Sequence, residues 1–267
     1  MSTLSVLILT KNEEENMTAV IGSARQCTSD IIVVDAGSTD GTVAMAKACG
    51  ARVIYHEWEN DFAKQRNIAR DSSTADWILY LDADERIDVK LAEEIRQVVE
   101  ADDQSKQYGM KRKSVAFGKK FTYGVLYPDT VMRLFPRQSV VWVNKVHERP
   151  DCVLTAKILS GYMEHHTYKN WQQWEKKLCL YTTAWAENAF ENGKTISKGG
   201  ILGHALGGFF KMFMLRRGFL DGWMGTYMCF NHFFYELLKY LKLYELNHEK
   251  ENRGIIDKTE NSDQGDA

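Results

Sequence analysis

The fold is decided by the stretch WILYLDAD, residues 77–84, in which five apolar residues lead into two carboxylates. An apolar run of this length, without regular alternation of polar residues, is typical of a strand that is buried on both faces of a parallel sheet. Asp82 and Asp84 come where that strand ends, and their spacing directs both side chains to the same side of the backbone. The stretch therefore predicts a buried strand that delivers two carboxylates to the edge of a sheet.

Similar apolar runs come before this strand, and a helix-like stretch separates each run from the next. The apolar runs are residues 5–9, 31–34 and 52–55. The helix-like stretches are residues 13–26, 42–49, 62–71 and, after the strand, 91–101. Alternation of strand and helix predicts an α/β fold, in which a parallel sheet is flanked by helices and connected by right-handed crossovers.

Polar residues follow three of these strands directly. They are residues 10–13, with sequence TKNE, residues 35–38, with sequence DAGS, and residues 82–84. Ligands of such sheets bind beyond the carboxyl ends of the strands, so we expect the three clusters on one rim. Asp35 at its strand end can accept hydrogen bonds from a nucleoside. The residues after it, up to Thr42, are equally well explained as a turn and a helix cap.

Asp82 and Asp84 are also candidate metal ligands. Mg²⁺ and Mn²⁺ prefer oxygen ligands and often bind through one or two carboxylates together with substrate phosphates. An isolated pair of this kind is more often a solvated acidic turn. Its place after the strongest apolar strand, beside two other polar clusters, favours the metal site here.

Composition excludes several classes of protein. The 267 residues carry a formal net charge of −2, which gives no electrostatic reason to expect a nucleic-acid partner. Five cysteines are dispersed without a C-x-x-C pair, which argues against a disulfide framework or a zinc ribbon and fits a reducing, cytoplasmic compartment. We find neither a secretory signal nor a window of the roughly 20 apolar residues that a spanning helix needs.

Four motifs together resemble a family 2 glycosyltransferase of the GT-A fold. They are TKNE at 10–13, DAGSTDGT at 35–42, AKQRN at 63–67 and DADE at 82–85, in the family's order and spacing. Less sharply, VHE at 146–148 and HHTY at 165–168 resemble the branch that contains lipopolysaccharide core glucosyltransferases. The resemblance implies a Rossmann-like, mostly parallel sheet flanked by helices, with a helical C-terminal appendage.

The resemblance also implies roles for individual residues. Nucleotide-sugar binding falls on Thr10, Asn12, Glu13, Asp35, Lys64, Arg66 and Asp82, and metal binding on Asp84 together with Asp82. Lys64 and Arg66 would lie near the base and the diphosphate, where a guanidinium can donate two parallel hydrogen bonds. Asp82 would reach the ribose or a metal-bound water, and Asp84 would ligate Mn²⁺ or Mg²⁺. Ala36 stands where many members have a second aspartate, a variant that is common in the surface-glycan branch.

Two further roles have several candidates. An inverting transferase needs a base that takes the proton of the acceptor hydroxyl, and we favour Glu148 over Asp129. The Glu-Asp pair that many relatives use is absent from the second half of the chain. A third metal ligand is expected from His165, with His166 and His147 as alternatives, because a neutral imidazole suits Mn²⁺ better than Mg²⁺.

The C-terminal region contains a broad apolar helical stripe. Its members follow one another at alternating steps of four and three residues: Trp223, Tyr227, Phe230, Phe234, Leu237, Leu241 and Tyr244. Basic residues lie near it in the sequence, at Lys211, Arg216, Arg217, Lys239 and Lys242. A wide aromatic face with basic neighbours favours a helix that lies in a bilayer interface. Packing on the catalytic domain and a dimer interface are the alternatives.

These patterns predict three parts of the chain. A GT-A catalytic domain is expected at 1–168, with a nucleotide-sugar half at 1–102 and an acceptor half at 103–168. A helical region, which is a candidate for membrane association, is expected at 169–246. The polar residues 247–267 are expected to form a disordered tail.

The function that follows is inverting, metal-dependent transfer of a hexose from a nucleotide-diphosphate donor to a cell-surface glycan or glycolipid. UDP-glucose as donor and lipopolysaccharide core as acceptor are implied by the resemblance alone. The enzyme would act as a peripheral protein on the cytoplasmic face of the inner membrane. The sequence leaves open whether it forms a homo-oligomer.

Two other functions compete with this interpretation. A sugar nucleotidyltransferase is disfavoured because TKNE stands where such enzymes carry a Gly-rich loop after the first strand. A non-catalytic nucleotide-sugar-binding scaffold at the membrane is disfavoured because the set of motifs is complete.

Overall fold

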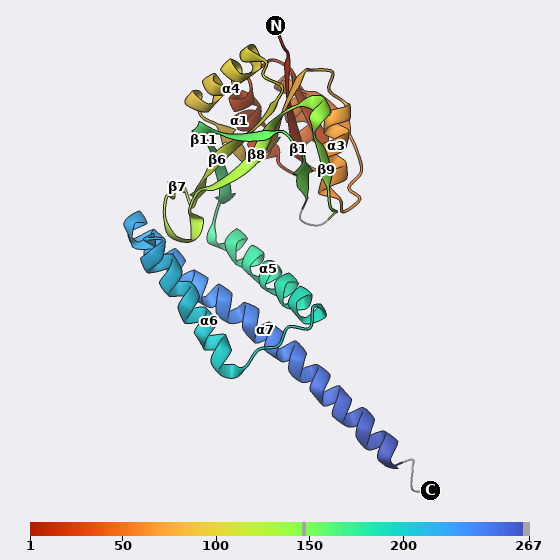
Figure 1. Ribbon diagram of the computed structural model, residues 1–267, viewed down its shortest axis with the longest axis vertical. Coiled ribbons are helices and arrows are strands. Elements are labelled where there is room, and N and C mark those ends of the chain that lie inside the picture. The colour runs from red at the N-terminus through yellow and green to blue at the C-terminus, as the bar shows by residue number, and fades with distance from the viewer. Residues whose placement is uncertain (146–147, 264–267) are drawn as a thin grey trace. The chain divides into compact units, whose positions relative to one another are not determined.

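The computed structural model describes residues 1–145 and 148–263 of the chain (Figure 1). The chain divides into two compact units. One consists of Met1–Val115 and Pro128–Thr167, and the other of Ala116–Tyr127 and the chain from Tyr168 onward. We call them the sheet unit and the helical unit.

The sheet unit is built on a mixed sheet with strand order β3-β2-β1-β4-β8-β6-β11-β5. The bounds are β1 Leu4–Thr10, β2 Ile31–Asp35, β3 Arg52–Tyr55, β4 Trp77–Asp82, β5 Glu85–Ile87, β6 Lys106–Ala116, β8 Asp129–Pro136 and β11 Thr155–Tyr168. The strands from β3 to β4 are parallel. By contrast, β4 pairs with β8, β8 with β6, and β11 with β5 in the antiparallel direction.

The α/β class is confirmed, and the parallel part of the sheet is limited to residues 4–82. Helices connect the strands of that part, as parallel pairing requires. From residue 106 to residue 136 the chain returns through β6 and β8 with no α-helix between them. Such a connection suits antiparallel pairing, so the sheet is less parallel than the sequence predicts.

Helices cover both faces of the sheet. They are α1 Glu14–Ala24, α2 Thr42–Ala48, α3 Phe62–Asp71 and α4 Val89–Ala101. Alternate residues of β1 enter different cores: Val6 and Ile8 pack with α1, α2 and α4, whereas Leu7 packs with α3. In Figure 1, α1 and α4 accordingly lie on one side of the sheet and α3 on the other. Burial on both faces explains why the strand has a continuous apolar sequence.

The register of the parallel strands brings their carboxyl ends together. Thr10 is the partner of Asp35, and Leu9 is the partner of Asp82. The polar clusters that follow β1, β2 and β4 therefore meet on one rim, as the sequence predicts. A separate antiparallel pair, β9 Val141–Val143 and β10 Arg149–Asp151, contributes residues near this rim.

The helical unit confirms the predicted C-terminal helical appendage. Its elements are η1 Gly124–Leu126, α5 Trp171–Glu191, α6 Lys198–Phe210, the π-helical turn η3 Lys211–Leu215, the 3₁₀ turn η4 Gly218–Asp221 and α7 Gly222–Asp263. Its core joins α5, α6 and α7 through Ala186, Ile201, Tyr240 and Leu243. Within the part of the chain that the structure describes, no helix has the length and apolar character needed to cross a bilayer.

Helix α7 continues beyond the expected end of the helical region. The sequence predicts a disordered tail at 247–267, whereas the helix runs to Asp263 and residues 264–267 lie outside the described residues. The segment contains Glu and Lys, which are good helix formers, and it contains no proline. The polar composition of residues 247–263 is therefore compatible with the continuation of α7.

Gly161 in β11 offers a test of how closely the sheet packs on α4. A Cβ atom at this position would lie 2.6 Å from the backbone N and Cα of Leu91. Gly161→Ala is therefore expected to lower the free energy of unfolding by about 1–3 kcal/mol, because backbone must move to admit the methyl group. Urea unfolding would measure the change.

Gly22→Ala is the matched control, because Gly22 lies in α1 with open space around its Cα. It is expected to leave stability unchanged or to raise it by up to about 1 kcal/mol. Equal stabilities of Gly161→Ala and wild type would contradict this description of the packing.

Candidate active site

The loops after β1 and β2 are held to each other by side chain–backbone hydrogen bonds. The Asn12 amide N–H donates to Ser38 Oγ at 2.8 Å, and Asn12 Oδ1 accepts from the Thr39 amide at 2.8 Å. Asn12 adopts a positive φ of 55°, which Asn tolerates better than most residues. Asp35 accepts from the amides of Gly37 and Ser38 at 3.1 and 3.0 Å, so it shapes its own loop.

Glu13 and Thr10 complete this part of the rim. The Glu13 amide donates to Thr42 Oγ1 at 2.8 Å, and its carboxylate accepts from Asn16 Nδ2 at 2.5 Å. Thr10 is buried, and among the described residues its hydroxyl has no hydrogen-bond partner. The predicted nucleoside-binding residues are therefore gathered in one place, and the side chains of all but Thr10 make hydrogen bonds there.

A buried ion cluster lies at the end of β4. Arg133 of β8 donates from Nη2 to Asp82 Oδ2 and also to Glu85 Oε1, the latter at 2.8 Å. Glu85 is fully buried, and its other oxygen accepts from the Asp82 amide at 2.9 Å. Arg133 is also buried. Glu85 and Arg133 thus depend on each other, because an unpaired charge in a fully buried position would be very unfavourable.

The cluster changes the ionisation of Asp82. Burial by itself would raise the pKa of Asp82, but the positive charges of Arg133 and Arg66 outweigh that effect and hold the pKa well below its usual range. Both carboxylate oxygens of Asp82 are occupied by these two arginines. Asp82 is therefore an ionised carboxylate whose first contacts are arginines.

Arg112 extends the cluster toward Asp129. Its Nη1 donates to Glu85 Oε1 at 3.1 Å, and its Nε and Nη2 donate to the two oxygens of Asp129 at 2.9 and 2.6 Å. Asp129, the second candidate for the base, is thus held in a paired ion bridge. Burial by itself would raise the pKa of Asp129, but the hydrogen bonds and the positive charge of Arg112 lower it below its usual value.

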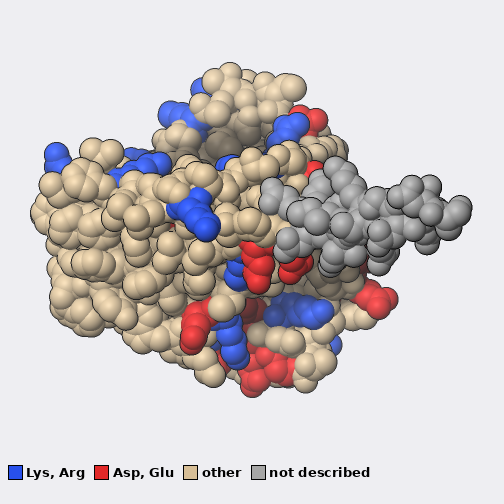
Figure 2. Space-filling view, turned by 90° about the horizontal axis from the view of Figure 1, so that it is seen from below, with Lys and Arg blue, Asp and Glu red and all other residues tan. Residues whose placement is uncertain are grey.

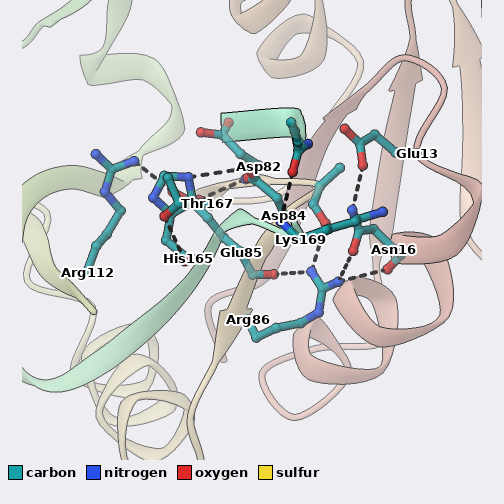
Figure 3. Close-up of polar contacts among 12 residues, drawn as sticks. Glu13, Asn16, Asp82, Asp84, Glu85, Arg86, Arg112, His165, Thr167 and Lys169 are labelled. Atoms are coloured by element: carbon teal, nitrogen blue, oxygen red, sulfur yellow. Dashed lines mark hydrogen bonds and ion pairs between the residues drawn. The ribbon is translucent and has the colours of Figure 1, made fainter. Parts of the chain in front are cut away.

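Asp84 faces away from this cluster and toward β11. Its Oδ2 lies 3.2 Å from His165 Nε2, and its backbone oxygen accepts from the His166 amide at 2.8 Å. Figure 3 shows Asp84 and His165 beside each other, with Glu85 and Arg86 next to them. Arg86 donates to the backbone oxygen of Ala83 at 2.7 Å and so supports the turn between β4 and β5.

The Asp84–His165 pair fits two ligands of one divalent ion. Two ligand atoms that lie about 2.1 Å from an ion, at right angles to each other, are about 3.0 Å apart. Within residues 1–145 and 148–263, no three His, Cys, Asp or Glu side chains gather closely enough to hold an ion by themselves. Further ligands would have to come from a bound substrate, as is usual for Mg²⁺ and Mn²⁺ at phosphates.

The alternative histidines are placed differently. His166 Nε2 lies 3.8 Å from Glu164 Oε2, and burial together with the charge of Arg86 lowers the pKa of His166. His147 lies outside the described residues. Of the two candidate histidines that the structure describes, His165 is the one whose ring nitrogen lies within 3.2 Å of the Asp84 carboxylate.

Arg66 connects Asp82 to Glu148. Its Nη2 lies 3.1 Å from Asp82 Oδ1 and 3.5 Å from Glu148 Oε1. The guanidinium carbon lies 4.6 Å from the centre of the Trp142 ring, and the side chain is buried. Glu148, the favoured base, is therefore held near the carboxylate that ends β4.

Lys64 points to a different neighbour from the one expected. Its Nζ donates to both carboxylate oxygens of Glu59 at 2.7 Å, while its backbone amide is capped by Asp61 at 2.9 Å. These bonds direct the Lys64 side chain to Glu59 rather than to Asp82 and its partners.

Sequence reasoning did not identify Arg133, Glu85 or Arg112. A signal for Arg133 was present, because it interrupts an apolar strand, and a charged residue in such a strand needs a buried partner. Glu85 directly follows the two aspartates. Which partners they choose depends on strand order, which the sequence did not reveal.

Comparison with known proteins agrees with this geometry. Residues 5–123 match the model of Glycosyl transferase family 2. This part of the chain is a family 2 glycosyltransferase domain. The match covers the parallel part of the sheet and the rim residues that follow β1, β2 and β4.

Relatives of this glycosyltransferase extend the likeness beyond the matched domain. An uncharacterised glycosyltransferase of Rickettsia typhi is 28% identical over 94% of this chain and 90% of its own. The lipopolysaccharide core biosynthesis glycosyltransferase LpsC of Rhizobium meliloti is 32% identical over 54% of this chain and 56% of its own. The solved structure of S. aureus TarS 1–349 in complex with UDP is 13% identical, covers 93% of this chain and 92% of its own, and has a TM-score of 0.46.

Removal of the Arg133 charge tests the ion cluster of the glycosyltransferase. Arg133→Met keeps most of the side-chain volume but leaves Asp82 and Glu85 without their shared cation. Unfolding by denaturant is expected to show a loss of about 3–5 kcal/mol.

The control is the double variant Glu85→Gln with Arg133→Met. Because it removes both charges of one pair, it is expected to lose less stability than the sum of the two single variants. Additive losses would show that the two residues do not stabilise each other.

Proposed function

We propose that this glycosyltransferase moves a hexose from a nucleotide-diphosphate donor to a cell-surface glycan or glycolipid, with inversion at the anomeric carbon. The observation that carries the proposal is the Asp84–His165 pair on the rim beyond β4, where the family motifs meet. Ligands of α/β sheets bind at this edge. UDP-glucose is the proposed donor, and the core of lipopolysaccharide is the proposed acceptor.

In this proposal Asp84 and His165 hold Mn²⁺ or Mg²⁺, and the imidazole favours Mn²⁺. A divalent ion bound there supplies positive charge to the departing diphosphate. Asp82 would serve the ribose or a water on the ion rather than bind the ion itself, because its own oxygens are already paired with Arg66 and Arg133. Thr10, Asn12, Glu13 and Asp35 would form the nucleoside end of the site.

Glu148 is the proposed base. It would accept the proton of the acceptor hydroxyl while the oxygen forms a bond to the anomeric carbon and the bond to the diphosphate breaks. Arg66 is buried against Trp142 and bonded to two carboxylates, so we assign it the positioning of Asp82 and Glu148. Its Nε and Nη1 have no hydrogen-bond partner among the described residues, so the contact with diphosphate that the resemblance implies stays part of the proposal.

The acceptor remains a proposal that rests on two supports. The Rhizobium meliloti relative is named for lipopolysaccharide core biosynthesis. The helical unit, in addition, exposes many apolar side chains, which suits an enzyme whose acceptor is a lipid. An enzyme that acts on such an acceptor would be a peripheral protein on the cytoplasmic face of the inner membrane.

Asp84→Asn tests the metal site. The amide keeps the shape of the side chain and removes its charge, so UDP release from UDP-glucose with Mn²⁺ is expected to fall by about 10²–10³. Addition of a chelator to the wild type should have a similar effect, and the unfolding transition of the variant should be unchanged. His166→Ala is the control and should retain near-normal activity. Near-normal turnover of Asp84→Asn would disprove the assignment.

Glu148→Gln tests the base. The variant is expected to transfer glucose to purified lipopolysaccharide core about 10²–10⁴ times more slowly, while its affinity for UDP is unchanged. Asp129→Asn is the matched control, because Asp129 is the other candidate and is tied to Arg112. A large loss in Asp129→Asn together with a small loss in Glu148→Gln would reverse the two roles.

A further inference from the structure

The helical unit exposes a large set of apolar side chains on consecutive elements. They are Leu202, Leu206 and Phe210 on α6, Met214 and Leu215 on η3, Phe219 and Leu220 on η4, and Trp223, Tyr227, Phe230 and Phe234 on α7. We call this set the docking face. Leu215 and Trp223 are the most open, at 75% and 74% exposed. Soluble monomers rarely leave so many large apolar side chains uncovered together.

Aromatic contacts join these elements into one body. The rings of Phe209 and Phe230 lie 4.9 Å apart, those of Phe209 and Phe213 lie 5.4 Å apart, and those of Phe213 and Phe219 lie 5.4 Å apart. These pairs connect α7 to α6, α6 to η3, and η3 to η4. The exposed residues are therefore carried by packed elements, which hold them in one arrangement.

The turn η4, which carries Phe219 and Leu220 of the docking face, is also firmly held. The carboxylate of Asp221 accepts from the amides of Thr122 and Tyr123 at 3.0 and 2.8 Å. A Cβ atom at Gly225 would lie 2.2 Å from the backbone oxygen of Gly218, so η4 and α7 approach as closely as two glycines allow. This packing fixes Leu220 and Trp223 at the surface of the turn.

Charge in this region is strongly one-sided. Residues 198–235 contain four cations, Lys198, Lys211, Arg216 and Arg217, and one acid, Asp221. That acid is buried and bonded to backbone amides, whereas the chain as a whole carries a net charge of −2. Figure 2 shows a face of the molecule with a wide area that carries few charged side chains, with scattered Lys and Arg above it and acidic and basic side chains together toward the lower right.

We infer that the docking face lies in the plane of an anionic lipid bilayer. Aromatic and aliphatic side chains would enter the acyl boundary, and the neighbouring cations would meet phosphate head groups. A second copy of the chain fits less well, because a two-fold interface pairs a surface with itself and would bring these cations together. Docking is independent of donor and sugar acceptor, so it is tested separately from the proposed transfer.

Sedimentation of the full-length protein with vesicles tests the inference. The wild type is expected to bind vesicles of equimolar phosphatidylcholine and phosphatidylglycerol, to bind phosphatidylcholine alone weakly, and to lose binding as ionic strength rises. Absence of binding to the anionic vesicles would overturn the inference. Equal binding to both kinds of vesicle would overturn the role of the cations.

Two pairs of substitutions separate the charged and apolar contributions. Lys211→Gln with Arg217→Gln should weaken binding to anionic vesicles about 25-fold, because each basic residue near such a surface contributes about fivefold. Leu215→Ser with Trp223→Ser should weaken binding by about tenfold or more, because both side chains lose their transfer into the acyl boundary. Donor hydrolysis should be unchanged in both.

Val89→Ser with Val153→Ser is the matched control, since these side chains are 73% and 98% exposed on the sheet unit. It is expected to bind vesicles like the wild type. Equal binding of the Leu215/Trp223 variant and the control would overturn the inference. So would a wild-type dimer that the Leu215/Trp223 substitutions dissociate, because the docking face would then be covered by a second copy.

Discussion

The ion cluster around Arg133 is the interaction on which the rim of this glycosyltransferase depends. One guanidinium, buried in β8, bonds to Asp82 at the end of β4 and to Glu85 at the start of β5. Charges in this position are tolerated only as a group, because each would be left without compensation if a partner were removed. The cluster thereby ties the parallel part of the sheet to its antiparallel part at the point where the metal ligand Asp84 is proposed.

This cluster also explains why two aspartates one residue apart have different surroundings. Asp82 turns toward the arginines, and its pKa is held low by their charges in spite of burial. Asp84 lies beyond the strand and faces His165 of β11. The two aspartates are therefore not equivalent: Asp82 is paired with two arginines, and Asp84 is the carboxylate that is proposed to bind the metal ion.

Hydrogen bonds between side chains and backbone amides organise the other end of the rim. Asn12 bonds to the loop after β2, and Asp35 caps the same loop. Asn12 and Asp35, which belong to the motifs that resemble a binding site, thus also hold the two loops in place. The same side chains are the ones proposed to bind the nucleoside, so the loops they hold would form the walls of that proposed site.

The sequence by itself determined the α/β class, the positions of the four parallel strands and the rim on which their polar residues meet. It could do so because burial on both faces leaves a continuous apolar run, and parallel pairing aligns the carboxyl ends of neighbouring strands. Its assignment of Asp84, His165 and Glu148 to the metal site and the base stays a prediction. The partners of Arg133 and the contact of Arg66 with Glu148 were decided only in three dimensions. These contacts join residues up to 82 positions apart, and local propensity and periodicity carry no information about which distant strands become neighbours.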